Sequence, residues 1–234
     1  MKINPKYISF YYEGMTEYPP FDLDPKKTAL LIVDMQKEFI DDNLGEAIEF
    51  KKNGEWERWQ PFRRRIKDIV IPNSVRLLNF FRSHDMRVTF GRIACVSPDG
   101  EDRSPVQKSD GWNNIFIHKD SVEAEFVDEL KPLPSEIVVD KTTDSVLTGT
   151  NYARIIRNMG IDTVVVTGIV TDQCVGATIR SLADEGFKVI CVEDCCAAGS
   201  MELHDAELKI MNIIYCSVLS TDETIQVLEE SLNK

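Results

Sequence analysis

Short apolar runs alternate with segments of helical spacing along most of this chain. The first run, TALLIVDM, is apolar almost throughout, which is typical of a strand buried on both faces. The apolar runs predict strands at 28–35, 86–93, 135–141, 162–168, 187–194 and 215–220. Helical spacing and end signals predict helices at 72–86, 121–130, 148–160, 174–186, 201–214 and 221–232.

This alternation predicts an α/β fold of parallel βαβ units, with helices on both faces of a doubly wound sheet. The sequence shows no internal repeat, low-complexity segment or linker, so we expect residues 1–234 to form a single domain. Residues 1–27 are aromatic and contain prolines without clear periodicity. We interpret them as an N-terminal arm that packs on the body or on a neighbouring subunit.

Two polar stretches interrupt the alternation, at residues 41–71 and 97–120. Stretches of this length often serve as lids or binding loops, so we expect these two to shape any ligand pocket. Within the first, the triplet Arg63–Arg65 is interpreted as a solvated face, with anion binding as the alternative.

Composition narrows the class of partner. The formal net charge is −12 over 234 residues, which argues against nucleic acid or an anionic membrane surface as the main partner. No stretch approaches the roughly 20 apolar residues of a membrane span, and the start has no signal-peptide pattern. The six cysteines contain no pair of CxxC motifs, so we expect reduced thiols in a cytoplasmic protein.

Three chemically reactive residues stand at the carboxyl ends of three predicted strands. They are Asp34, Lys141 and Cys174. Ligands of doubly wound sheets bind beyond these ends, so the fold would gather the three side chains at one edge. The first turn of a helix favours a thiolate at Cys174, and Lys141 would favour it further. Asp34 can accept the thiol proton and later deliver it to a leaving amine.

The segment between the fourth strand and its helix supplies the remaining part of this chemistry. Backbone N–H groups around Ile169, Val170 and Cys174 can stabilise an oxyanion. A nucleophile, an acid–base group and oxyanion donors together indicate acyl transfer. One difficulty remains, because strands two places apart are separated by about 10 Å, and Lys141 would need its full length to reach the centre.

Each of these residues also has an ordinary structural interpretation. A cysteine near a strand end is commonly a small buried hydrophobe, an aspartate there a cap, and a lysine there a solvated side chain. The pattern alone leaves the structural and the catalytic interpretation evenly balanced. Other catalytic motifs are absent: GxGxxG does not follow the first strand, and neither a P-loop nor GxSxG occurs.

The segments LLIVDMQKEF, VVDKTTDS and VVVTGIVTDQCVGATIRSLADEGFKVICVEDCCAA closely resemble the isochorismatase-like cysteine hydrolases, from about Thr28 to Ser220. The resemblance implies a three-layer Rossmann-like fold whose six parallel strands follow the order 3-2-1-4-5-6. It also implies a catalytic triad of Asp34, Lys141 and Cys174, and a cis peptide between Ile169 and Val170. Members of the family are commonly dimers or tetramers, so we expect a homodimer or homotetramer.

Departures from the patterns within this family favour one branch. Isochorismatases proper lack the nucleophilic cysteine, and nicotinamidases have a metal site with histidines where this chain has GRIACVSPDGEDRS. We therefore expect no metal and no cofactor. The resemblance is closest to ureide and carbamoyl hydrolases such as N-carbamoylsarcosine amidase, ureidoacrylate amidohydrolase and biuret hydrolase.

The sequence thus predicts a cysteine-dependent amidohydrolase of a small linear amide, most simply a carbamoyl or ureido compound. The alternatives are a vinyl-ether hydrolase, a nicotinamidase-like amidase, an idle binding module and a thiol redox protein. Possible substrate contacts, each with a core or surface role as the alternative, are Gln36, Phe39, Trp112, Tyr152 and Thr171.

Overall fold

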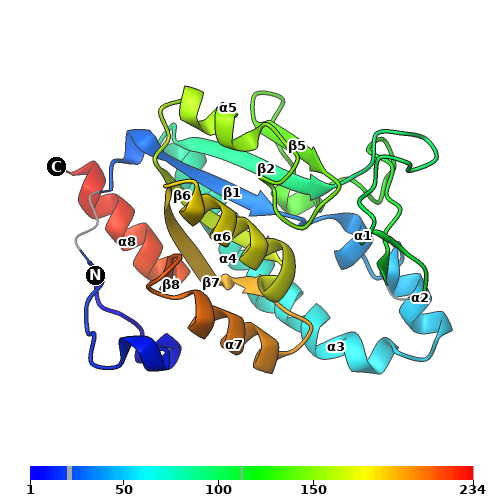
Figure 1. Cartoon of the computed structure of the whole chain (residues 1–234), viewed down its shortest axis with the longest axis horizontal. Helices are drawn as coiled ribbons and strands as arrows, with labels where there is room; N and C mark the ends of the chain where they lie inside the picture. The colour runs from blue at the N-terminus through cyan, green and yellow to red at the C-terminus, as the bar shows by residue number, and fades with distance from the viewer. Residues whose placement is uncertain (20–22, 112, 234) are drawn as a thin grey trace.

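The computed structural model describes residues 1–19, 23–111 and 113–233. A six-stranded parallel sheet has the order β5-β2-β1-β6-β7-β8 (Figure 1), which confirms the predicted order. Its strands are β1 (Thr28–Val33), β2 (Arg87–Ile93), β5 (Ile137–Lys141), β6 (Thr163–Ile169), β7 (Lys188–Ala197) and β8 (Ser217–Leu219). A short antiparallel pair, β3 (Lys108–Ser109) and β4 (Asn113–Asn114), lies outside this sheet.

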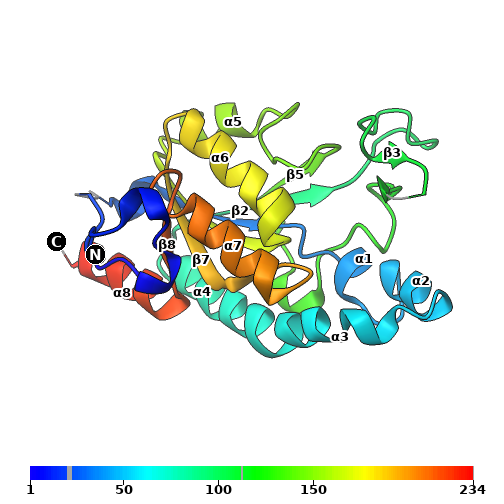
Figure 2. The ribbon, with the colours of Figure 1, turned by 60° about the horizontal axis from the view of Figure 1, so that its bottom comes forward.

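Helices cover both faces of the sheet, as Figure 2 shows. They are α1 (Lys37–Ile40), α2 (Glu46–Lys52), α3 (Trp56–Arg65), α4 (Ile71–Ser83), α5 (Tyr152–Asn158), α6 (Gly176–Asp184), α7 (Met201–Met211) and α8 (Thr221–Leu232). In the described ranges, no helix combines the length and the apolar character needed to cross a membrane.

Strand β1 divides the core into two halves. All six of its residues are buried, and alternate side chains point to opposite faces of the sheet. Leu30 and Ile32 pack with α4 and α8, whereas Leu31 and Val33 pack with α5, α6 and α7. The uniformly apolar run is therefore explained by helices on both sides, as expected for a parallel sheet.

The segment 41–71, interpreted from the sequence as a lid or binding loop, is largely helical. It forms α2 and α3, and a π-helical turn at Ile66–Val70 joins α3 to α4 in one helical run. Phe62, Ile66 and Val70 recur every four residues, and all three are buried in the same core cluster as the apolar face of α4. This spacing extends the helix well before the predicted start at residue 72.

The predicted helix at 121–130 is also wrong. Only Asp128–Leu130 forms a turn of 3₁₀ helix. The backbone before it pairs with the segment after β1: Lys37 N–H donates to the carbonyl of Glu125, and Val127 N–H donates to the carbonyl of Met35. Groups used in this pairing are not available for helical hydrogen bonds.

The N-terminal segment packs against the last strand and against α7. The buried Tyr18 hydroxyl donates to the carbonyl of Val218 at 3.0 Å and contacts the side-chain oxygen of Asn212 at 2.8 Å. Lys6 forms an exposed ion pair with Asp205 at 2.8 Å. These contacts attach the segment to the end of the sheet that bears β8, away from the cavity described below.

Gly168 stands where β1 and β6 run side by side toward their carboxyl ends. Its φ is +121°, and it pairs with Val33 in the β1–β6 register. A Cβ at this position would lie 2.0 Å from the carbonyl oxygen of Val33. Glycine is therefore required here both by the backbone conformation and by the close approach of the neighbouring strand.

We expect Gly168→Ala to lower the free energy of unfolding by about 3 kcal/mol or more, because neither strand can move without disturbing the sheet. Gly186→Ala is the matched control, since Gly186 has φ +84° but a Cβ at that position would meet nothing within 4 Å. That control should lose only about 1–2 kcal/mol. Equal losses for the two variants in urea denaturation would contradict this interpretation.

Candidate functional site

The fold brings Asp34, Lys141 and Cys174 into contact. Lys141 Nζ lies 2.8 Å from Asp34 Oδ2 and 3.4 Å from Cys174 Sγ. Lys141 stands on β5, which is two places from β1 in the sheet. Its side chain nevertheless spans the distance between the two strands and reaches Asp34. All three side chains are buried, with Lys141 only 1% exposed. The predicted convergence of three strand ends is thus present in the structure.

Asp34 follows the last residue of β1 and adopts a left-handed backbone conformation. Its φ is +51°, in the left-handed region that aspartate adopts more readily than most residues. Its N–H donates to the carbonyl of Gly91 at 2.8 Å, which holds this turn against β2. The turn carries the carboxylate off the strand and to the edge where Lys141 and Cys174 lie.

Cys174 lies in a π-helical turn, Thr171–Val175, that connects β6 to α6. The peptide between Ile169 and Val170 is cis, as the resemblance implied. Within the described residues, the N–H of Val170 donates no hydrogen bond to the backbone. This arrangement leaves a donor at the predicted oxyanion position, beside the thiol.

Burial sets the protonation states of this cluster. Burial raises the pKa of Cys174 well above its ordinary value, the charge of Asp34 raises it further, and Lys141 opposes both effects. Burial also raises the pKa of Asp34, and Lys141 again opposes the shift. For Lys141, burial alone would lower the pKa, but the charges of Asp34 and Cys174 outweigh it and raise the pKa.

These shifts revise one expectation from the sequence. We expected the helix start and Lys141 to stabilise a resting thiolate, whereas the raised pKa of Cys174 keeps a thiol at neutral pH. A nearby base must therefore take the proton as the sulfur attacks. The carboxylate of Asp34, which pairs with Lys141 and interacts with the Cys174 thiol, is the base placed to accept that proton.

A cavity of about 540 Å³ opens in front of the cluster. Of the residues predicted as substrate contacts or oxyanion donors, Phe39, Ile169 and Val170 line it, together with Asp34 and Cys174. The other lining residues are Glu46, Trp59, Phe62, Ile93, Val106, Asn113, Asn114, Ile115, Asp144, Asp172, Gln173, Gly199 and Leu203. Among the described residues, no group of three or more His, Cys, Asp or Glu side chains is arranged to hold a metal ion.

Three of the predicted substrate contacts lie outside this lining. Gln36 is buried and pairs with the backbone of Ile93, donating to its carbonyl at 2.9 Å and accepting from its N–H at 2.8 Å. Tyr152 is buried in the core, and its hydroxyl contacts that of Thr89 at 2.9 Å. Both side chains satisfy backbone or core partners instead of facing the cavity. Trp112, a fourth predicted contact, lies outside the described residues.

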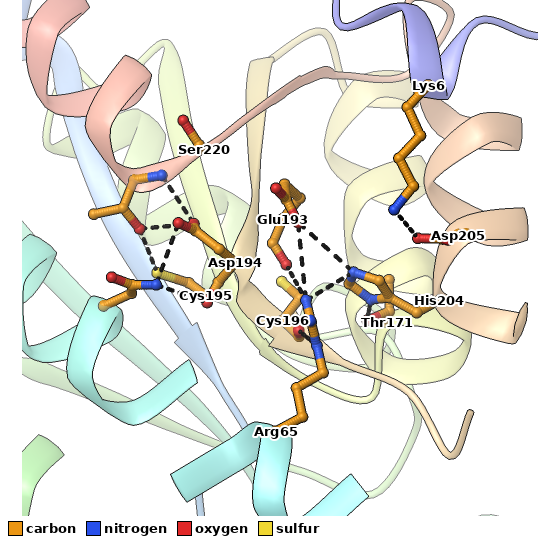
Figure 3. A network of polar contacts seen from close by, with 12 residues as sticks. Lys6, Arg65, Thr171, Glu193, Asp194, Cys195, Cys196, His204, Asp205 and Ser220 are labelled. Carbon is orange, nitrogen blue, oxygen red and sulfur yellow. Dashed lines mark hydrogen bonds and ion pairs between the residues drawn. The ribbon is translucent and has the colours of Figure 1, made fainter. Parts of the chain in front are cut away.

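Thr171, the third of these, supports the segment that carries Cys174 (Figure 3). Its hydroxyl lies 2.8 Å from Nδ1 of the buried His204, whose Nε2 lies 3.0 Å from the Arg65 guanidinium. A guanidinium has no acceptor, so Nε2 accepts and the proton of a neutral His204 resides on Nδ1, which donates to Thr171. Arg65 also donates to the carbonyls of Glu193 and Cys196.

The triplet Arg63–Arg65 is therefore not a solvated face. Arg63 is 3% exposed, and it donates to Asp42 and to the carbonyls of Ile40 and Asp41. The anion-binding alternative also lacks support at these two positions, because both guanidinium groups already have partners. Only Arg64 is exposed.

The sequence located the cavity-forming segments but not their lining residues. Glu46, Trp59 and Phe62 come from the stretch 41–71, and Asn113 and Asn114 from 97–120. Aromatic residues in a polar stretch were the available signal for Trp59 and Phe62. No signal marked Glu46, because nothing in a charged helix shows which carboxylate turns inward.

Glu46 lines the cavity, and Glu38 lies close enough to affect the ionisation of Glu46. Burial, with a further contribution from Glu38, raises the pKa of Glu46 to about 7. Burial and the charge of Glu123 raise the pKa of Glu38 to about 7. Both carboxyl groups therefore lose protons near neutral pH and not in the usual acidic range.

Comparison with known proteins identifies relatives along most of the chain. The family model described as the isochorismatase domain matches residues 28–223. A ureidoacrylate amidohydrolase of Pseudomonas savastanoi pv. phaseolicola is 32% identical over 218 residues, covering 87% of this chain and 84% of that protein. A maleamate amidohydrolase of Pseudomonas putida is 29% identical over 116 residues, covering 48% of this chain and 54% of that protein.

Solved structures show the same fold. A cysteine hydrolase from Pseudomonas syringae pv. phaseolicola superposes with a TM-score of 0.76 at 22% identity, covering 92% of this chain and 99% of that one. N-carbamoylsarcosine amidase from Thermoplasma acidophilum has a TM-score of 0.64 at 25% identity, covering 84% and 97%.

The pKa of Glu46 predicts how one substitution changes stability with pH. Because burial favours the protonated carboxyl, its contribution to stability is complete below the ordinary pKa of 4.5 and is lost as the pH rises through about 7. Glu46→Gln cannot ionise. Relative to the wild type, we expect this variant to gain about 1–2 kcal/mol between pH 5 and pH 8, measured by urea denaturation.

Glu49→Gln is the control, since Glu49 lies on the same helix with a side chain that is 59% exposed. Its stability relative to the wild type should not change over this range. A constant difference between Glu46→Gln and the wild type would show that Glu46 ionises normally.

Proposed function

This chain belongs to the isochorismatase family of hydrolases, and from that premise we propose that it cleaves the C–N bond of a small linear amide, a carbamoyl or ureido compound. The proposal includes a covalent acyl-enzyme on Cys174. One observation carries it: a single buried ammonium, Lys141, contacts both a thiol and a carboxylate at the floor of a cavity.

In the first half of the proposed reaction, Cys174 Sγ attacks the amide carbonyl carbon and its proton passes to Asp34. The carbonyl oxygen becomes an oxyanion, which the N–H groups of Val170 and Cys174 stabilise. The raised pKa of Asp34 makes its carboxylate a stronger base than an exposed one, which suits this transfer. Lys141 stays protonated and stabilises the developing negative charge on sulfur.

Collapse of the tetrahedral intermediate then breaks the C–N bond. Protonated Asp34 gives its proton to the leaving nitrogen, so the amine or ammonia departs neutral and a thioester remains on Cys174. In the second half, Asp34 takes a proton from water, and the hydroxide formed attacks the thioester. The acid product leaves, and the sulfur recovers its proton through Asp34.

Amide cleavage is favoured over the vinyl-ether alternative by the cluster itself. Hydrolysis of a vinyl ether needs only protonation and attack by water, without a nucleophile supplied by the protein, whereas here the thiol lines the cavity beside a base. The named relatives with amidohydrolase or amidase activity support the same direction. A ureidoacrylate amidohydrolase and an N-carbamoylsarcosine amidase both cleave ureido or carbamoyl groups by name.

Removal of the nucleophile tests the covalent mechanism. We expect Cys174→Ala to reduce ammonia release from the best substrate of a ureide and amide panel by at least about 10⁴-fold, because no other group can form the thioester. Cys216→Ala is the control, since Cys216 is buried to a similar degree (6% against 5% exposed) but precedes β8. Ammonia release by Cys174→Ala within tenfold of the wild type would rule out the acyl-enzyme.

Trapping tests the role of Asp34. In Asp34→Asn the asparagine side chain can neither accept the thiol proton nor activate water. We therefore expect slow acylation of Cys174 and still slower hydrolysis of the acyl-enzyme. Mass spectrometry of this variant with substrate should show an adduct at Cys174 whose mass equals the acyl group. Full turnover by Asp34→Asn without any adduct would assign the base to another residue.

A further inference from the structure

The cavity is lined by acidic side chains without a matching cation. Beyond the Asp34–Lys141 pair, Glu46, Asp144 and Asp172 line it, and no Lys, Arg or His is among the described lining residues. Lys141 lies behind Asp34 and is occupied by it and by Cys174. A substrate carboxylate would therefore meet no counter-charge in this cavity, and like charges close to it would oppose binding.

Two of these carboxylates lack partners. Among the described residues, none forms a hydrogen bond or an ion pair with Glu46, and its nearest basic neighbour, Arg63, donates to Asp42 instead. Oδ1 of Asp172 is buried and accepts no hydrogen bond. Partly buried carboxylate oxygens without a donor gain most from a bound cation or donor.

Aromatic rings line the same cavity as Glu46. Trp59, Phe62 and Phe39 line the cavity, and Trp59 stacks on Phe50 with ring centroids 4.5 Å apart. Phe50 covers one face of the Trp59 indole and holds the ring in position. A cavity that offers both aromatic rings and a carboxylate is a favourable setting for an ammonium group, which interacts with both.

We propose that this cavity selects an amide that carries a positively charged amino group and no carboxylate, with that group placed between Glu46 and Trp59. The proposal rests on the amide hydrolysis proposed above and specifies its substrate class. Glu46 is the specificity-determining residue, and the Cys174 end of the cavity receives the scissile carbonyl.

Thiol-reactive probes of opposite charge measure this preference without any hydrolysis. A cationic and an anionic methanethiosulfonate of equal size each convert a thiol into a mixed disulfide. Their rates at Cys174 are followed by peptide mass mapping, with Cys174→Ala as the blank and 2-mercaptoethanol as the reference thiol. The ratio of the cationic to the anionic rate, divided by that of the reference, reports the charge selectivity of the cavity.

At a pH of about 8.5, where Glu46 is ionised, we expect this normalised ratio to exceed ten in the wild type. In Glu46→Gln it should fall about fivefold, because one negative charge near the probe is lost and solvent screens part of its effect. Glu49→Gln, on the exposed side of the same helix, should keep the wild-type ratio. A normalised ratio of one or less in the wild type, or a ratio that Glu46→Gln leaves unchanged, would overturn the proposal.

A panel of three ureido compounds of equal length, ending in an ammonium, a methyl or a carboxylate group, separates this proposal from the proposed function. The ammonium compound should have the highest kcat/KM, and Glu46→Gln should raise its KM with little change in kcat. Preference for the carboxylate compound would overturn the substrate class and leave amide hydrolysis intact. If none of the three is hydrolysed, the reaction proposal fails, and the probe ratio still decides the charge preference.

Discussion

The site depends on one buried ammonium. Lys141 is almost wholly shielded from water, and the carboxylate of Asp34, the sulfur of Cys174 and the carbonyl of Thr143 at 3.1 Å offset the loss of its hydration. Breaking a buried ion pair by removing one partner typically costs about 3–5 kcal/mol, because the other charge is left without compensation. The three residues therefore form a unit in which each constrains the position and the protonation of the others.

The strand arrangement is what makes this unit possible. β5 and β6 flank the β2–β1 pair, so a side chain from β5 must pass the end of β2 to reach the turn after β1. Gln36 occupies that end and continues the hydrogen-bond pattern of Ile93 with its amide. The Gln36 side chain thus satisfies the backbone groups at the carboxyl end of β2. The ammonium of Lys141 can pass this end and reach Asp34 without leaving those groups unpaired.

Most of the fold and the central triad were accessible from the sequence, because strand ends are marked by simple signals. An apolar run followed by Asp34, Lys141 or the segment leading to Cys174 is visible without knowledge of packing, and the parallel topology then brings these ends together. Residues that depend on which way a side chain turns were not accessible. Gln36 and Tyr152 carry polar groups that can serve a pocket equally well, and only their buried partners show that they do not.

Two local predictions, the helix at 121–130 and the thiolate at Cys174, were wrong for a related reason. The helix predicted at 121–130 has suitable composition, but its backbone is committed to the chain after β1. The prediction of a thiolate at Cys174 failed because burial and the charge of Asp34 raise the pKa of the thiol more than Lys141 lowers it. In both cases a local signal was outweighed by a contact between distant parts of the chain.

The continuous helical run from Trp56 to Ser83 has a further consequence for how this protein can change over evolutionary time. One end of the run carries Trp59 and Phe62 at the cavity, and the other end carries Leu77 and Phe81 in the core. Inserting or deleting one residue between them would turn one end relative to the other by about 100°. On this side of the cavity, new substrate preferences in this lineage should therefore arise by exchange of side chains at constant length.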